Sequence, residues 1–181
     1  MVEHKFQRGS ARMFGNVWLE RLSHVHPATP AVIYLPLTAA CVYTAAFVYG
    51  QAWASILWQV GAGWLFWTLL EYWLHRLLFH LEVKSKVSER IYFYLHGVHH
   101  DWPWDLSRLV IPPLFSVSLA AGFYGVFRAL LGADVMYASF GGFLLGYVVY
   151  DSTHWYTHVG KSKNRVLKWL REQHMRHHFQ D

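Results

Sequence analysis

Histidine is the residue type in this sequence that could most clearly do chemistry. Imidazole is a good ligand for iron, zinc and copper. Residues spaced i, i+3 and i+4 share one face of a helix, so HGVHH and HMRHH are each predicted to aim three rings in one direction. Ten of the 13 histidines fall into four such groups: His75 and His80 in HRLLFH, His96, His99 and His100 in HGVHH, His154 and His158 in HWYTH, and His174, His177 and His178 in HMRHH.

Ten imidazoles are more than one metal ion can use, which predicts two ions with four or five nitrogens each. His75 and His80 lie about 140° apart on an ideal helix of ~3.6 residues per turn, so their convergence requires a helix end or a distortion near Phe79. His4, His24 and His26 follow no such spacing. We interpret their basic segment as a membrane-surface or capping element.

Polar and aromatic residues near these groups are candidates for supporting roles. A carboxylate can orient the outer N–H of a ligating ring, and the candidates by position are Asp151, Asp101, Asp105 and Glu71. Trp102 and Trp104 bracket Pro103 directly after HGVHH, and Arg108 follows. These three are candidates for binding a lipid substrate, although ordinary interfacial Trp and Arg explain them equally well.

Four apolar stretches must position the histidines. Residues 31–50 and 51–70 are each 20 residues without a charge, the length that crosses a ~30 Å hydrocarbon core as a helix. Val110 to Phe127 is free of charge over 18 residues and Val135 to Tyr150 over 16. We therefore predict spans over about 31–50, 51–70, 110–131 and 135–150, with Pro112-Pro113 at the start of the third. For the fourth stretch, a buried helix of a soluble core is the alternative.

Charges scattered through residues 1–30 argue against a signal peptide.

The connections and charges predict the topology. The first two spans meet at Gly50-Gln51 and the second two are separated only by 128–134, so each pair forms a hairpin. Of the 16 Lys and Arg residues, 15 lie in residues 1–30, 71–109 and 151–181, which places these parts in the cytoplasm. The prediction is one domain over 1–181: an all-α integral membrane protein with four transmembrane helices in two hairpins and a cytosolic helical cap that carries the histidines.

Composition narrows the classes further. Apolar residues make up 54% and charged residues 15%, which excludes a disordered chain and makes a nucleic-acid partner a poor interpretation of the net charge of +5. The single cysteine, Cys41, excludes an internal disulfide and a thiolate metal cluster.

The residues that flank the histidines resemble a known family. HGVHHDWPWDLSRLVIPP (96–113), GYVVYDSTHWYTHVG (146–160) and LREQHMRHHFQ (170–180) resemble the fatty acid hydroxylase superfamily of membrane di-metal oxygenases, and most of all the catalytic domain of fatty acid 2-hydroxylases. The resemblance covers nearly the whole chain from about residue 30. It implies hydroxylation of carbon 2 of a fatty acyl chain, free or in a sphingolipid, with O₂ and two iron ions, although zinc competes well for imidazole in a purified protein.

The same resemblance implies supporting residues and partners. It favours Asp151 with Tyr147 and Tyr150 beside the metal ligands, and interfacial anchoring is the alternative for the two tyrosines. Eukaryotic relatives often carry a cytochrome b5-type domain, for which 30 N-terminal residues are too few, so we expect a separate electron donor, cytochrome b5-type or a ferredoxin. Relatives usually continue past the last histidine group, whereas this chain stops three residues after His178. The expected location is the bacterial inner membrane or the endoplasmic reticulum, with the metal site on the cytoplasmic face.

Two alternative functions remain from the sequence. A sterol, carotenoid or alkane oxygenase of the same superfamily would keep the metals and change the substrate. A membrane metal transporter is the other, but transport requires polar ligands near the middle of the bilayer, and the four predicted spans contain neither histidine nor acid.

Overall fold

The structure is a computed structural model that describes residues 7–79 and 83–180, and every regular element in these ranges is helical, as predicted. Short π-helical segments alternate with α-helices. In chain order the elements are α1 (Val17–Leu22), α2 (Thr29–Tyr43), η1 (Thr44–Val48), α3 (Trp53–Leu74), η2 (His75–Phe79), α4 (Lys86–Tyr92), η3 (Phe93–Gly97), α5 (Val98–Asp101), η4 (Leu106–Arg108), α6 (Pro113–Val159) and α7 (Arg165–Phe179).

The chain divides into two compact units. The bundle unit contains residues 28–72 and 112–151. The histidine unit contains the described residues of 1–27, 73–111 and 152–181. Every described member of the four histidine groups therefore belongs to one unit.

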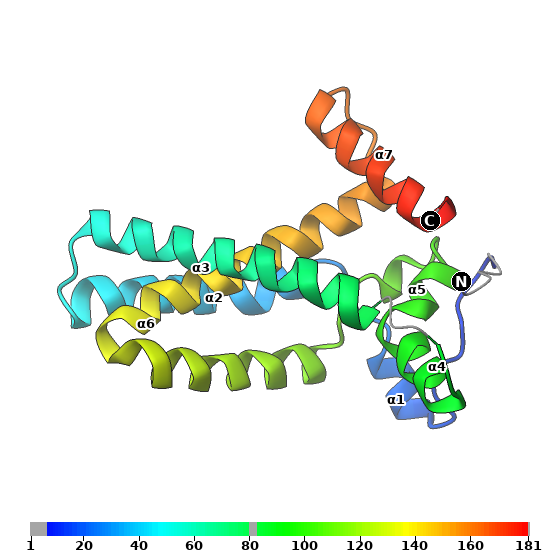
Figure 1. Ribbon diagram of the computed structural model, residues 1–181, viewed down its shortest axis with the longest axis horizontal. Coiled ribbons are helices and arrows are strands. Elements are labelled where there is room, and N and C mark those ends of the chain that lie inside the picture. The colour runs from blue at the N-terminus through cyan, green and yellow to red at the C-terminus, as the bar shows by residue number, and fades with distance from the viewer. Residues whose placement is uncertain (1–6, 80–82, 181) are drawn as a thin grey trace. The chain divides into compact units, whose positions relative to one another are not determined.

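The bundle unit packs α2, α3 and most of α6 lengthwise beside one another (Figure 1). The rings of Tyr34 and Trp67 each lie near the ring of Tyr147, with centroids 5.2 and 5.1 Å apart. Their burial joins three helices in one apolar core, the main source of folding free energy in such a unit. The buried members of this core are Tyr34, Trp67, Phe127, Met136, Phe140, Phe143, Leu144, Tyr147 and Val148.

Glycines bring α3 and α6 into backbone contact. A Cβ atom placed at Gly142 would overlap the carbonyl group of Val60, and one at Gly63 would overlap that of Ser139. At Gly146 a Cβ would lie 2.7 Å from the Cβ of Trp67. Small residues spaced in this way are typical of close helix pairs in membranes.

In each predicted hairpin, one glycine with a positive φ separates the two helices. Gly50 (φ 61°) lies between η1 and α3, and Gly132 (φ 75°) interrupts α6. The first arm of α6 begins at Pro113, where the sequence predicted the start of a helix. A residue with a Cβ would be strained at such φ values, which is why glycine occupies both turns.

Two helical stretches are long and apolar enough to cross a membrane, Thr29–Val48 and Leu106–Val159. The second contains the break at Gly132. Several large apolar side chains of the bundle unit point outward, among them Trp58, which is 78% exposed, and Leu130, which is 77% exposed. Such a surface suits a lipid environment better than water.

Candidate metal centre

Histidine rings converge into two groups in the histidine unit. In the first group, the ring nitrogens of five residues lie within 4.8 Å of one another: His99, His154, His158, His174 and His178. We call this group the five-ring group. His99 Nε2 lies 3.0 Å from His154 Nε2 and 2.9 Å from His178 Nε2. His174 Nε2 lies 2.7 Å from His158 Nε2 and 3.1 Å from His178 Nε2.

The second group contains His75, His96 and His177, whose ring nitrogens also lie within 4.8 Å of one another. His75 Nε2 and His177 Nε2 are 3.1 Å apart. His100 joins this group, because its Nε2 lies 2.9 Å from His96 Nε2 and 3.1 Å from His177 Nε2. We call these four residues the four-ring group. The predicted ligand His80 lies outside the described residues.

Sequence neighbours are divided between the two groups, which corrects one expectation. HGVHH was expected to aim three rings one way, but His99 belongs to the five-ring group while His96 and His100 belong to the four-ring group. In HMRHH, His177 separates from His174 and His178 in the same manner. The reason is that adjacent residues differ by ~100° around a helix, so only the i, i+4 pair stays together.

Local helix structure sets these directions. His75 begins the π-helix η2, so the distortion expected near Phe79 is present over His75–Phe79. His96 lies in a second π-helix, η3, immediately before α5. Such segments change the angle between successive residues and are frequent at functional sites. Asn164 is the N-cap residue of helix α7, because its side chain accepts hydrogen bonds from the backbone N–H groups of Val166 and Leu167.

The geometry of both groups fits a bound cation. Nitrogens bound to one ion at ~2.0–2.1 Å are about 2.9–3.4 Å from their neighbours, close to the spacing seen here. A neutral ring has a single N–H, so the five nitrogens that share one small volume cannot all be paired by N–H···N bonds. A cation would satisfy all the lone pairs at once.

Burial keeps these rings in the form that binds metal. Desolvation lowers the pKa of His99 and of His178, and neighbouring histidines act in the same direction. For His174 the same causes lower the pKa to about 3. The three rings are therefore neutral at pH 7, with lone pairs available to an ion.

One ligand ring is oriented by the backbone. The backbone of Pro103 lies within hydrogen-bonding reach of the His158 ring. Proline has no N–H, so the partner must be its carbonyl oxygen and the ring must donate. Since His158 Nε2 lies toward His174, the donating atom is Nδ1. This pattern, with one ring nitrogen inward and the other held from outside, is characteristic of metal-binding histidines.

The predicted supporting residues Tyr147, Tyr150 and Asp151 belong to the bundle unit. Tyr147 and Asp151 are buried, and the carboxyl group of Asp151 faces the hydroxyl group of Tyr147. Tyr150 hydrogen-bonds Glu71. All four lie on α3 or α6, the two helices that lead to His75 and His154. Their support of the rings stays a prediction.

The three residues expected to bind lipid differ in their surroundings. Trp104 is 57% exposed, and its ring centroid lies 6.2 Å from that of Phe179. Trp102 is half-buried near Phe93, at 6.4 Å. Arg108, in contrast, has only 2% of its side chain exposed and pairs with Glu20 and Asp105. The guanidinium of Arg108 is thus enclosed by protein groups, and its role in binding the lipid substrate stays a prediction.

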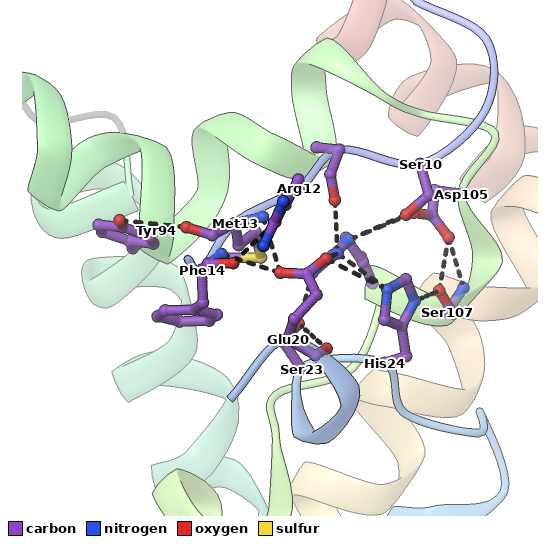
Figure 2. Close-up of polar contacts among 12 residues, drawn as sticks. Ser10, Arg12, Met13, Phe14, Glu20, Ser23, His24, Tyr94, Asp105 and Ser107 are labelled. Atoms are coloured by element: carbon purple, nitrogen blue, oxygen red, sulfur yellow. Dashed lines mark hydrogen bonds and ion pairs between the residues drawn. The ribbon is translucent and has the colours of Figure 1, made fainter. Parts of the chain in front are cut away.

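Sequence reasoning interpreted the N-terminal segment as a membrane-surface or capping element but did not connect it with Arg108. Glu20, Ser23 and His24 contact Arg108, which also pairs with Asp105. Figure 2 shows His24 beside Ser107 and Asp105. Glu20 and Arg108 are 88 positions apart, and no spacing rule connects them. The only signal was an acid, Glu20, in a segment with more basic than acidic residues.

Comparisons with known proteins agree with this geometry. The family model described as "Fatty acid hydroxylase" matches residues 60–181. The "Ceramide very long chain fatty acid hydroxylase SCS7" of Saccharomyces cerevisiae is 38% identical over 179 residues, which cover 97% of this chain and 46% of that protein. The "Dihydroceramide fatty acyl 2-hydroxylase FAH1" of Arabidopsis thaliana is 37% identical, covering 82% and 62%. The "Fatty acid 2-hydroxylase" of Rattus norvegicus is 44% identical, covering 65% and 32%.

A solved structure shows the same fold. The chain described as "Full length scs7p (only hydroxylase domain visible)" superposes with a TM-score of 0.86 at 37% identity, covering 94% of this chain and 64% of that one. The chain spans between a third and about three fifths of the length of the three curated relatives named above.

Proposed function

This chain belongs to the fatty acid hydroxylase family, and from that premise we propose that it is a membrane-bound di-metal oxygenase that hydroxylates carbon 2 of a fatty acyl chain. The reaction would convert a CH₂ group beside the acyl carbonyl, with O₂, two electrons and two protons, into a CHOH group and water. The acyl chain would be free or part of a ceramide-like lipid, the substrate class in the names of the relatives.

The single observation that carries the proposal is the convergence of nine described imidazoles into two groups. We infer one ion for each group, with His80 as a further ligand that the sequence predicts. Iron ions would supply the one-electron O₂ chemistry that side chains lack, and zinc could replace them in a purified sample. The imidazoles would hold the ions without adding negative charge, and the Pro103 carbonyl would keep the ring of His158 in place.

Protons and substrate would be handled by residues on the helices that lead to the rings. We assign Tyr147, Tyr150 and Asp151 to holding and transferring protons, because they are ionisable groups at least partly buried in the bundle unit and the carboxyl group of Asp151 faces the Tyr147 hydroxyl. Trp104 and Trp102 would contact the lipid near its carbonyl end, where amphipathic aromatic rings are favoured.

The membrane arrangement is part of the proposal. Four spans in two hairpins, turned at Gly50 and Gly132, would leave both termini and residues 71–109 in the cytoplasm. The histidine-bearing residues 71–109 and 151–181 would then be on the cytoplasmic side. Electrons would come from a separate donor, cytochrome b5-type or a ferredoxin.

Lipid analysis of cells that express the chain tests this function. We expect 2-hydroxy acyl lipids with the wild type and none with His99→Ala, since His99 contacts two other rings of its group. Hydroxylated sterols, carotenoids or alkanes in place of the acyl product would reassign the substrate. Full product from His99→Ala would overturn the metal centre.

A further inference from the structure

The N-terminal segment from Gln7 to Val25 is fastened along the part of the chain that carries HGVHH. The backbone N–H of Gln7 donates to the carbonyl of Asp101 at 2.8 Å, and that of Val25 donates to the carbonyl of Ser107 at 2.8 Å. Between them, Phe14 stacks on Tyr94 with ring centroids 5.4 Å apart. We call residues 7–25 the strap. It holds the histidine-bearing segment at both of its ends.

A buried guanidinium lies at the centre of this contact. Arg108 donates from Nη1 to Ser23 Oγ at 2.7 Å, and from Nη2 to Glu20 Oε1 at 2.6 Å and to the Ala11 carbonyl at 2.5 Å. Its Nε lies 3.3 Å from both Ser10 Oγ and Asp105 Oδ2. Most of these partners come from the strap, as Figure 2 shows around Glu20 and Ser23.

Glu20 is itself held by the strap. Its second carboxylate oxygen, Oε2, accepts hydrogen bonds from the backbone N–H groups of Met13 and Phe14 at 2.9 and 2.8 Å. The carboxylate therefore joins the strap backbone to Arg108. Charge-assisted hydrogen bonds of this kind are stronger than neutral ones and fix geometry.

On its other side, Arg108 meets a turn that ends next to the metal centre. The backbone N–H of Asp105 donates to the carbonyl of Trp102 at 3.0 Å, which closes a turn with Pro103 as its second residue. Asp105 then accepts from the N–H and the hydroxyl of Ser107 at 3.1 and 2.6 Å. The buried Pro103 carbonyl of this turn is the group that His158 contacts.

We propose that Arg108 is a positioning residue for the ring of His158. By linking Glu20 of the strap to Asp105, it fixes the Trp102–Asp105 turn, whose Pro103 carbonyl holds His158 with Nε2 directed at the five-ring group. The inference rests on the proposed function only in requiring that metal binds at these rings. Lysine could not replace the arginine fully, because one ammonium group cannot reach partners on several sides as a planar guanidinium does.

The test compares the Zn²⁺ affinity of full-length variants in detergent, measured by competition with a chelator after circular dichroism has shown unchanged helix content. We expect Arg108→Met to bind Zn²⁺ about tenfold more weakly, the lower end of the effect of losing support for a ligand, and Arg108→Lys to lie between. Arg12→Gln is the matched control, because Arg12 is an exposed strap cation whose hydrogen bonds within residues 7–79 and 83–180 go to the nearby carbonyls of Phe14 and Gly15. It should bind as the wild type does.

A double variant separates positioning from general stabilisation. If Arg108 acts through His158, adding Arg108→Met to His158→Ala should cost little further affinity, since the ring that it positions is already gone. A second full tenfold loss in the double variant would overturn the proposal, as would wild-type affinity in Arg108→Met. Should Arg108→Met lose helix content, Glu20→Gln replaces it, with a smaller loss expected and wild-type affinity as the contradicting result.

These measurements need neither lipid nor O₂, so they separate the inference from the function. Wild-type affinity in the Arg108 variants would remove the positioning role and leave the oxygenase proposal intact. A wild-type chain that binds no Zn²⁺ would overturn both.

Discussion

The Nε2 atoms of His99 and His178 lie 2.9 Å apart, although the residues are 79 positions apart in the sequence. His99 is followed by His100, and His178 is preceded by His177. The rings of both neighbours belong to the four-ring group. Short segments at two distant places in the chain therefore each contribute to both groups.

This division predicts how metal content responds to single substitutions. His99→Ala should leave about one ion per chain, because the four-ring group keeps its ligands, and His100→Ala should also leave about one, from the other group. The double variant should bind none tightly. Elemental analysis of purified protein measures this, with His26→Ala as a control because His26 belongs to neither group. If each single variant lost both ions, the two groups would not be separate sites.

Removing the metal should destabilise the protein. Without a cation, the five nitrogens of the five-ring group face one another with too few N–H groups to pair them. A ligand present at 100 times its Kd stabilises a fold by about 2.7 kcal/mol. We therefore expect the thermal midpoint of the protein in detergent to fall by several degrees after chelation and to recover when Zn²⁺ or Fe²⁺ is added. A midpoint indifferent to chelation would argue against metal at these rings.

Acid should release the strap. Burial works to raise the pKa of Glu20, but the Phe14 N–H, the Arg108 guanidinium and the Met13 N–H outweigh it, so the pKa of this carboxyl is lowered from 4.5. A lowered folded-state pKa means that the contribution of Glu20 is fully present above about pH 4.5 and is lost as pH falls through the folded value. Hydrogen exchange of the Met13 and Phe14 amides, corrected for the intrinsic rate, should rise in that window.

Glu20→Gln serves as the reference for the acid experiment, because it cannot titrate. Its strap amides should exchange faster than those of the wild type at neutral pH and should respond less to acid. Identical acid profiles for the two proteins would assign the change to another group.

The crossing of α3 and α6 should be intolerant of side chains. Gly142→Ala forces a Cβ against the Val60 carbonyl, and overpacking of this kind costs about 1–3 kcal/mol. Gly61→Ala is the matched control, since nothing lies within 4 Å of a Cβ at that position of the same helix pair. We expect a lower thermal midpoint for the first variant and an unchanged or higher one for the second. Equal midpoints would mean that the helices can separate at no cost.

Much of the helical layout could be predicted because it depends on local sequence. A run without charge indicates an apolar helix wherever it packs, and Pro113 and Gly132 fix backbone geometry by themselves. The distortion at His75–Phe79 was predictable for the same reason, from the i, i+5 spacing alone.

The pairing of ligands could not be predicted in the same way. Helical spacing shows which rings share a face, but which group receives His99 and which receives His100 depends on where α7 brings His177 and His178. The surroundings of Arg108 could not be predicted for a related reason. An arginine near tryptophans suits a membrane surface, and only the fold shows that Glu20 and Ser23 enclose it.

The two consecutive pairs, His99-His100 and His177-His178, have ring centroids 5.8 Å apart in each case. A single peptide bond thus tethers one centre to the other at both places. A backbone shift, an inserted residue or a proline at either pair would disturb both ions together. If each group holds one ion, adjustment of one ion alone would be left to the ligands outside these pairs: His75 and His96 in the four-ring group, and His154, His158 and His174 in the five-ring group.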